Sequence, residues 1–155
     1  MAYTDADEVA PRLFVGSKPP PGRHAPYDVI VLAAIEYQPA AHLFPGVEVI
    51  HAPFDDAPTR SMHLNEVLTA TKAASHVARR LREGRRVLVT CAMGLNRSAL
   101  IAAIAMHDVY GMSAEEIITR IRRTRSAWAL SNPNFVRILR AVIDAKRSRD
   151  QAAIR

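Results

Sequence analysis

The chain has 155 residues and a mass of 17.1 kDa, a size that suits one compact domain, so we expect residues 1–155 to form a single domain. Hydrophobic residues make up 49% of the chain and charged residues 23%, a balance that excludes a disordered or fibrous protein. The single cysteine, Cys91, excludes both an internal disulfide framework and a cysteine-rich zinc site.

The formal net charge is +6, and 18 of the 21 basic residues are arginines. Many of them cluster in residues 79–86 and 120–125, a pattern typical of solvated helix faces. The alternative interpretation is a rim that attracts anions to a phosphate site. No aromatic residues alternate with these arginines to stack on single-stranded nucleic acid, so nucleic-acid binding is not expected.

Targeting and membrane-spanning segments are not evident. Residues 1–9 carry three acidic residues, unlike a signal peptide. The longest apolar stretch, Ala99–Met106, has about eight residues, against roughly 20 for a membrane-spanning helix. We therefore expect no membrane span and a cytoplasmic location, whose reducing conditions suit a lone thiol.

In chain order, the first half predicts short strands separated by turn residues. Arg12–Gly16 is a brief apolar run that ends before a proline-rich loop. Tyr27–Ala34 is a nearly continuous β-branched run, typical of a strand buried on both faces. A short helix is expected over Pro39–Phe44 and a further strand over Val47–His51, which the turn-rich segment 53–58 closes.

The second half predicts helices around one more strand. Apolar residues recur with a 3.6-residue period over Ser61–Glu83, which predicts an amphipathic helix. Arg86–Cys91 is a compact strand, and Ser98–Tyr110 is apolar on nearly all sides, as in a buried helix.

Two further helices are indicated by their starting residues. Ser113 and Glu116 form a capping box, and Asn132 before Pro133 is typical of an N-cap. The polar end from Lys146 onward is expected to fray over its last eight or so residues. The alternation of strands and helices predicts an α/β fold with a central, mostly parallel sheet of about four to five strands flanked by helices.

The most informative segment is Val87–Ser98, which predicts a strand, a short loop and the start of a helix. Such a loop can turn its backbone N–H groups around an anion, and the helix N-terminus adds partial positive charge. Cys91 opens this loop, where that charge favours the nucleophilic thiolate. Arg97 can bind two phosphoryl oxygens with one guanidinium group, and Gly94 permits the backbone conformation that an inward-facing loop demands.

Cys91–Ser98 resembles the Cys-x5-Arg-Ser/Thr signature of the dual-specificity group of cysteine-dependent protein tyrosine phosphatases. The resemblance extends to Leu13–Ser17, which is similar to the family's first strand, and to Ala52–Asp56, which is similar to its general-acid loop. Leu130–Phe135 is similar to the segment that opens the family's last helix. These segments cover most of the chain in the family's order, which implies a dual-specificity-phosphatase-like fold.

The resemblance implies a two-step mechanism without a cofactor or metal. Cys91 attacks phosphorus to form a phosphocysteine while an aspartic acid protonates the leaving oxygen, and Ser98 stabilises the sulfur when water later displaces it. Arg97 and the backbone amides of the phosphate loop hold the phosphoryl oxygens. The loop residues concerned are Ala92, Met93, Gly94, Leu95, Asn96 and Arg97.

Two adjacent aspartates compete for the role of general acid. The family's loop aligns its acid with Asp56, which leaves Asp55 as a neighbour that is either solvated or fixes the loop. Asp beside Pro is also common in ordinary turns, so the assignment between the two aspartates stays open.

One position departs from the family pattern, because Thr90 stands where the family has a histidine. Threonine keeps a hydroxyl donor but carries no charge, which implies weaker activity or a phosphate-binding module with little turnover. The loop between Cys91 and Arg97 has no lysine, which favours phosphorylated proteins or peptides over phosphoinositides as substrates. A phosphatase of RNA 5′ ends is the alternative that the arginine-rich surface suggests.

Overall fold

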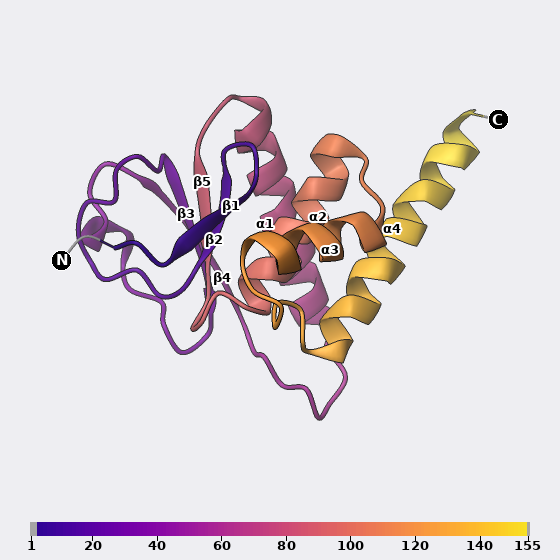
Figure 1. Ribbon diagram of the computed structural model, residues 1–155, viewed down its shortest axis with the longest axis horizontal. Helices are drawn as coiled ribbons and strands as arrows, with labels where there is room; N and C mark the ends of the chain where they lie inside the picture. Colours follow the sequence, from indigo (N-terminus) through magenta and orange to yellow (C-terminus); the bar gives the residue numbers. More distant parts are fainter. Residues whose placement is uncertain (1–2, 155) are drawn as a thin grey trace.

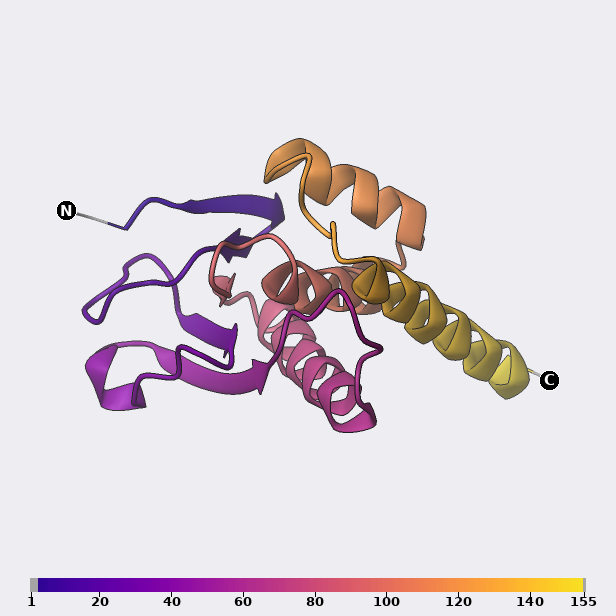
Figure 2. The ribbon, with the colours of Figure 1, turned by 90° about the horizontal axis from the view of Figure 1, so that it is seen from below.

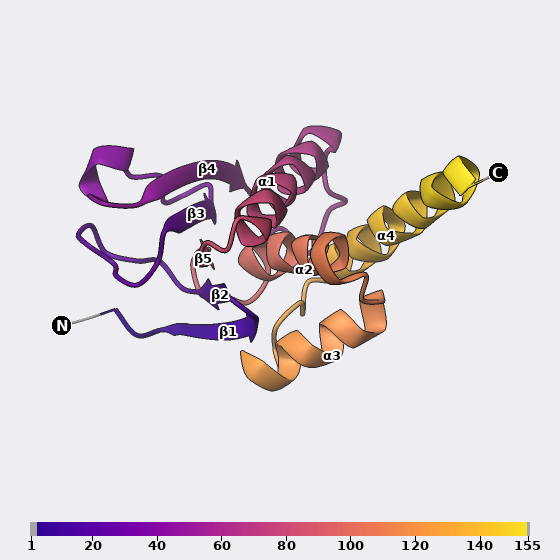
Figure 3. The same ribbon diagram turned by 90° about the horizontal axis from the view of Figure 1, so that it is seen from above.

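The central sheet of the computed structural model, which describes residues 3–154, has five strands in the order β1-β2-β5-β3-β4. The strands are β1 (Ala6–Ala10), β2 (Leu13–Gly16), β3 (Val29–Ala34), β4 (Glu48–Phe54) and β5 (Val87–Thr90). Strands β2, β5, β3 and β4 run parallel, and β1 pairs antiparallel with β2 at one edge. This arrangement, seen in Figure 3, confirms the prediction of a mostly parallel sheet.

The alternation of side chains along β3 and β5 builds a core on each face of the sheet. Val29, Val31, Val87 and Val89 belong to the large core that the helices cover. Ile30, Leu32 and Leu88 point to the other face, where they pack with Phe44 in a smaller cluster. Because both faces are covered, the two central strands are apolar at nearly every position.

Four helices lie on one side of the sheet within the described residues (Figures 1 and 2). They are α1 (Leu64–Arg82), α2 (Arg97–Tyr110), α3 (Ala114–Thr124) and α4 (Pro133–Ile154). Helix α2 packs against the other three helices and against β2, β3 and β5. Its residues 97–106 are all buried, which explains why the sequence is apolar on nearly all sides there.

The caps expected for two helices are present. Ser113 Oγ accepts a hydrogen bond from the backbone N–H of Glu116 at 3.2 Å, which fixes the start of α3. Asn132 Oδ1 accepts from the backbone N–H of Asn134 at 3.0 Å, with Pro133 as the first residue of α4.

Several boundaries differ from the sequence prediction. Strand β1 was not expected, because its segment is rich in acidic residues. The helix expected over Pro39–Phe44 is a single 3-10 turn, Ala41–Leu43. Helix α4 continues to Ile154, where a frayed end was expected. Its residues 147–154 are exposed and project from the body in Figure 1.

None of the helices between residues 3 and 154 has the length and apolar character needed to cross a membrane.

Candidate functional site

The candidate site lies at the carboxyl ends of the parallel strands, where loops from β2, β3, β4 and β5 meet. Cys91 follows directly after β5, the loop of residues 92–96 (the phosphate loop) comes next, and α2 begins at Arg97. Strand β5 lies between β2 and β3, so the loops after those two strands flank Cys91 on both sides. Ligands of open α/β sheets bind at this edge.

The Cys91 thiol is buried, with 4% of the residue exposed. Its backbone N–H donates to the Gly16 carbonyl at 3.3 Å, which ties the start of the phosphate loop to the end of β2. Its Sγ lies 3.1 Å from Ser98 Oγ in the first turn of α2, and Ser98 is fully buried. The hydroxyl of Ser98 is therefore in position to donate a hydrogen bond to the sulfur.

Arg97 is also buried, and its guanidinium is paired with Glu36. Nη1 and Nη2 of Arg97 each donate to one carboxylate oxygen of Glu36 at 2.6 Å, and Nη1 also donates to the Phe54 carbonyl at 3.1 Å. Arg97 Nε is buried and has no hydrogen-bond partner among the described residues. The Nε hydrogen and the second hydrogen of Nη2 are thus left for an incoming anion.

Glu36 is a functional residue that the sequence analysis missed. It comes two residues after β3, and the hydrogen bonds from Arg97 lower the pKa of Glu36 to about 2, well below its usual value of 4.5. The carboxylate therefore stays ionised at any physiological pH. The signal in the sequence was an acidic side chain just beyond the carboxyl end of a buried strand.

The two candidate acids occupy different environments in the segment of residues 55–63 between β4 and α1, called the acid loop below. Asp56 Oδ1 accepts a hydrogen bond from Asn132 Nδ2 at 2.7 Å. Asp55 Oδ1 accepts from the backbone N–H of Asp56 at 2.8 Å, and its other oxygen lies 3.6 Å from an Arg60 nitrogen. Asp55 thus stabilises the turn, while Asp56 contacts the segment that begins α4.

Asn132 connects the acid loop to the phosphate loop, a role beyond the N-cap that the sequence predicted. Its backbone N–H donates to Asn96 Oδ1 at 2.9 Å, while its side-chain amide holds Asp56. Asn134 holds the same acid loop through its amide, which donates to the Arg60 carbonyl and, at 3.2 Å, to the Ala57 carbonyl.

Glu66, in the first turn of α1, anchors the other end of the acid loop. It is 8% exposed and accepts hydrogen bonds from Arg60 Nη1 at 2.8 Å, from the His63 backbone N–H at 2.9 Å and from the Asp55 backbone N–H at 3.2 Å. The pKa of Glu66 is lowered to about 2, chiefly by the hydrogen bonds from Arg60.

Thr90, the departure from the family pattern, donates its hydroxyl hydrogen to the Val31 carbonyl on β3 at 2.7 Å. The residue is 1% exposed. Its hydroxyl hydrogen is therefore used within the sheet rather than offered to the phosphate loop or to the thiol.

The remaining residues of the phosphate loop differ in burial. Gly94 is buried, Ala92, Leu95 and Asn96 are half-buried, and Met93 is 67% exposed. Gly94 has a φ of +70°, in the left-handed region. A Cβ at Gly94 would lie 2.6 Å from the Gly16 backbone carbon, so both its conformation and the space around it require glycine.

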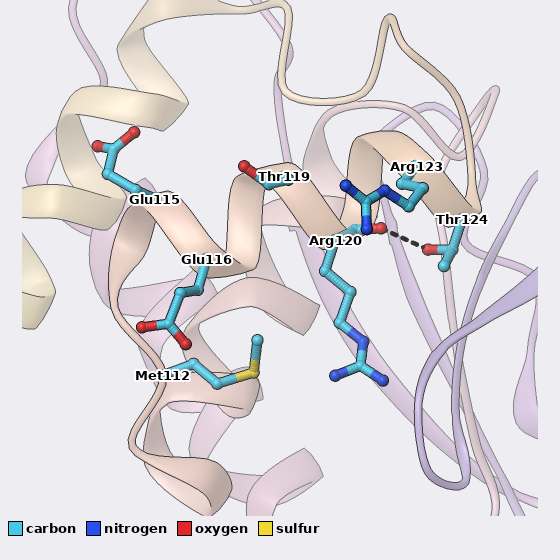
Figure 4. A pocket seen from close by; sticks show the side chains of 7 residues that line it. All are labelled: Met112, Glu115, Glu116, Thr119, Arg120, Arg123 and Thr124. Carbon is cyan, nitrogen blue, oxygen red and sulfur yellow. Dashed lines mark hydrogen bonds between the residues drawn. The ribbon is translucent and has the colours of Figure 1, made fainter.

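Two of the hollows in the described part of the chain lie near the acid loop and on α3, outside the phosphate loop. One, of about 490 Å³, lies beside Glu36 and the acid loop and is lined by Ile35, Asp55, Arg60 and His63 among others. The second, of about 620 Å³, lies on the outer face of α3 (Figure 4). Its lining residues are Met112, Glu115, Glu116, Thr119, Arg120, Arg123 and Thr124, none of which belongs to the phosphate loop.

Comparison with known proteins identifies the family. The family described as the catalytic domain of dual specificity phosphatases matches residues 30–144, which include the acid loop and the phosphate loop. The chain belongs to this family. It is a cysteine-dependent phosphatase of the dual-specificity class, as its resemblance to that family implied.

Solved structures share this fold. Human DUSP28 superposes with a TM-score of 0.75 at 22% identity, over 94% of this chain and 97% of that chain. The active form of Tk-PTP gives a TM-score of 0.75 at 22% identity, over 92% and 98% of the two chains. PTPMT1 superposes with a TM-score of 0.72 at 17% identity, over 95% of this chain and 99% of that chain. At these identities the likeness shows the fold alone. No curated protein matches the chain by sequence.

The geometry at Gly94 predicts that Gly94→Ala abolishes phosphate binding, because the added methyl group displaces the phosphate loop. Gly111→Ala is the matched control: its φ is +68°, but a Cβ there meets none of the described atoms within 4 Å. Both variants carry the left-handed strain of about 1 kcal/mol, which urea unfolding measures. In a phosphate-inhibition assay, wild-type affinity in Gly94→Ala would contradict this account.

The lowered pKa of Glu66 predicts a stability loss in acid. A carboxylate whose pKa falls from 4.5 to about 2 on folding stabilises the protein above pH 4.5, and this contribution is lost as the pH falls towards 2. Thermal unfolding at pH 7 and pH 3 is therefore expected to differ less in Glu66→Gln than in the wild type. Part of the difference remains in the variant, because Glu36 titrates over the same interval.

Glu115→Gln is the control, since this ion-paired side chain is 71% exposed and is expected to leave the pH dependence unchanged. If Glu66→Gln and the wild type lost the same stability between pH 7 and pH 3, the assigned role of Glu66 would be refuted.

Proposed function

We propose that the protein hydrolyses phosphomonoesters on phosphorylated proteins or peptides, with Cys91 as nucleophile, Arg97 as phosphate ligand, Asp56 as general acid and Ser98 as the stabiliser of the departing thiolate. The observation that carries the proposal is the buried Nε of Arg97, without a partner among residues 3–154, in the loop that Cys91 opens. A buried cationic donor without a partner marks an anion site, and a buried thiol in the same loop supplies a nucleophile.

The charges around Arg97 support the assignment of Cys91, Arg97 and Asp56 to one site. Burial is the largest single influence and lowers the pKa of Arg97, whereas the hydrogen bonds to Glu36 raise it. Negative charge at Cys91 and at Asp56 raises the pKa of Arg97 further, so the net shift is upward. The guanidinium is therefore the cation that the thiolate and the acid loop share.

In the first step, the Cys91 thiolate attacks phosphorus, and the bond between phosphorus and the leaving oxygen breaks. Asp56 gives its proton to that oxygen, so an alcohol or phenol leaves and a phosphocysteine remains. In the second step, water attacks the same phosphorus, Asp56 takes a proton from the water, and the sulfur leaves as a thiolate. Ser98 Oγ, 3.1 Å from the sulfur, donates a hydrogen bond to the departing thiolate.

The substrate class follows from the family and from the phosphate loop. Phosphotyrosine is the first candidate, with phosphoserine and phosphothreonine as the second specificity. Residues 92–96 contain no basic side chain, which favours phosphoproteins over phosphoinositides. A structure of PTPMT1 in complex with PI(5)P shares the fold, with a TM-score of 0.74 at 17% identity, so a phosphoinositide is the comparison substrate for the assay.

The reaction as written needs no metal or cofactor, and a lone thiol as nucleophile suits a reducing, cytoplasmic compartment. A single catalytic domain over residues 1–155 is supported by the single sheet and the large core that the helices cover. Turnover that persists in excess chelator is the expected result for metal independence.

The proposal predicts hydrolysis of an aryl phosphate and of phosphopeptides, with turnover reduced at least about 10³-fold in Cys91→Ser. Asp56→Asn is expected to lower kcat by about 10²- to 10⁴-fold, because it removes the proton donor. Asp55→Asn is the matched control and is expected to lower kcat much less, since Asp55 accepts a backbone hydrogen bond within the turn.

Equal kcat values in the two aspartate variants would overturn the assignment of Asp56. Phosphate binding without turnover in the wild type would indicate a binding module, the alternative that Thr90 suggests. Faster release from the phosphoinositide than from any phosphopeptide would overturn the proposed substrate class.

A further inference from the structure

Behind the phosphate loop lies a second buried arginine, Arg125, which caps the carboxyl end of α3. Its sequence position, within an arginine cluster, suggested a solvated helix face. That interpretation is wrong for this residue, because its side chain is only 6% exposed. We propose that Arg125, held by Asp5 and Asp7, is a positioning residue that orients the backbone amides of the phosphate loop. This inference rests on the proposed role of that loop in binding phosphate.

Arg125 contacts the backbone of the phosphate loop directly. Arg125 Nε donates to the Gly94 carbonyl at 3.1 Å, and Nη2 donates to the Met93 carbonyl at 2.9 Å. The next carbonyl, that of Leu95, accepts from the backbone N–H of Leu130 at 2.7 Å. Three successive carbonyls of the phosphate loop are therefore held by groups from the segment that links α3 to α4.

In the planar trans peptide bond, the C=O and the N–H of one peptide unit point in opposite directions. Fixing the carbonyls of Met93 and Gly94 fixes the N–H groups of Gly94 and Leu95 in the opposite sense. These N–H groups thus point away from Arg125. Amides oriented in advance bind an oxyanion without first having to be reorganised.

Arg125 is in turn held by two carboxylates. Its Nη1 contacts Asp5 Oδ1 at 2.8 Å and Asp7 Oδ2 at 3.0 Å. The two carboxylates come from the N-terminal edge of the sheet, and α3 lies beside β1 in Figures 2 and 3. A buried guanidinium is costly unless it is paired and its donors are used, and here the side that faces the sheet edge is paired with carboxylates.

The packing around Gly94 leaves this arrangement little freedom. A Cβ built at Gly94 would lie 2.6 Å from Arg125 Nη2 and 2.7 Å from the Gly16 carbonyl oxygen. The guanidinium therefore lies directly against the loop backbone, and the end of β2 lies close to the same glycine. The backbone of the N-terminal segment is tied to the end of β2 as well, since the Ser17 N–H donates to the Asp5 carbonyl at 3.2 Å.

A positioning role and simple electrostatic attraction predict opposite changes in the affinity for phosphate when the carboxylates beside Arg125 are removed. Asp5→Ala/Asp7→Ala removes two negative charges near the phosphate loop and leaves Arg125 in place. If charge alone mattered, phosphate would bind more tightly to this variant. If the carboxylates position Arg125, phosphate binds more weakly, because the loop amides lose their fixed orientation.

The test measures the inhibition constant of inorganic phosphate, together with kcat and KM for an aryl phosphate. Arg125→Gln is expected to raise the inhibition constant and KM by about 10- to 100-fold. Asp5→Ala/Asp7→Ala is expected to raise both several-fold, and Arg125→Lys to restore part of the affinity, because its ammonium can donate to one of the two carbonyls.

Two control variants are matched to these changes. Arg123→Gln alters an exposed arginine two residues away that lines the hollow on the outer face of α3 (Figure 4). Asp144→Ala/Asp150→Ala removes two exposed carboxylates from α4. In both controls, the inhibition constant of phosphate, kcat and KM are expected to stay within about twofold of the wild-type values, because the changes lie on the surface away from these contacts.

An inhibition constant in folded Asp5→Ala/Asp7→Ala that equals or falls below that of the wild type would overturn the positioning role. If Arg125→Gln does not fold, this double variant decides the matter alone, since both of its substitutions lie at exposed carboxylates. A wild-type protein that neither binds phosphate nor hydrolyses the aryl phosphate would instead overturn the proposed function itself.

Discussion

The rest of the site depends on a short backbone loop and on the two buried guanidinium groups next to it. Arg97 lies at the helix that the loop enters, and Arg125 lies behind the loop. Each cation is neutralised by carboxylates from a different part of the chain: Glu36 after β3 for Arg97, and Asp5 and Asp7 for Arg125. The carboxylates do not use every hydrogen-bond donor of either cation. Nε of Arg97 has no partner among the described residues, and Nε and Nη2 of Arg125 donate to carbonyls of the phosphate loop. Buried charges are tolerated because they are paired and hydrogen-bonded.

The acid loop is fixed by a separate set of polar contacts. Glu66 accepts hydrogen bonds at its start, Asn134 binds its carbonyls, and Asn132 links Asp56 to Asn96 of the phosphate loop. The acid and the phosphate loop are thus joined through Asn132, the residue before α4. In this arrangement, a few hydrogen bonds connect the two loops directly.

The elements that the sequence predicted well are those whose pattern is local. The β-branched run of β3, the 3.6-residue period of α1 and the all-apolar α2 were expected with small boundary differences. The motif from Cys91 to Ser98 is also local, since strand, loop and helix are contiguous. Strand β1 was missed because its segment is rich in acidic residues. These carboxylates pair with Arg125, which lies about 120 residues further along the chain, so no local pattern reveals the pairing.

The supporting residues of the site could not be predicted for the same reason. Glu36 and Glu66 resemble ordinary surface carboxylates in the sequence, and Arg125 resembles the exposed arginines beside it. Their roles arise from contacts that the fold creates, over separations of 61 residues for Glu36 and Arg97 and 31 for Arg125 and Gly94. The sequence shows that Thr90 keeps a hydroxyl donor, but only the fold shows that this hydroxyl donates to the Val31 carbonyl within the sheet.

In the proposed mechanism, the phosphoryl group passes through the sulfur of Cys91. A rapid acid quench of the protein during turnover of a phosphopeptide, followed by mass spectrometry of its proteolytic fragments, tests this claim directly. The account predicts one added phosphoryl group on the fragment that contains Cys91, and none on that fragment in Cys91→Ser. Steady turnover without phosphoryl transfer to Cys91, or turnover retained in Cys91→Ser, would contradict it.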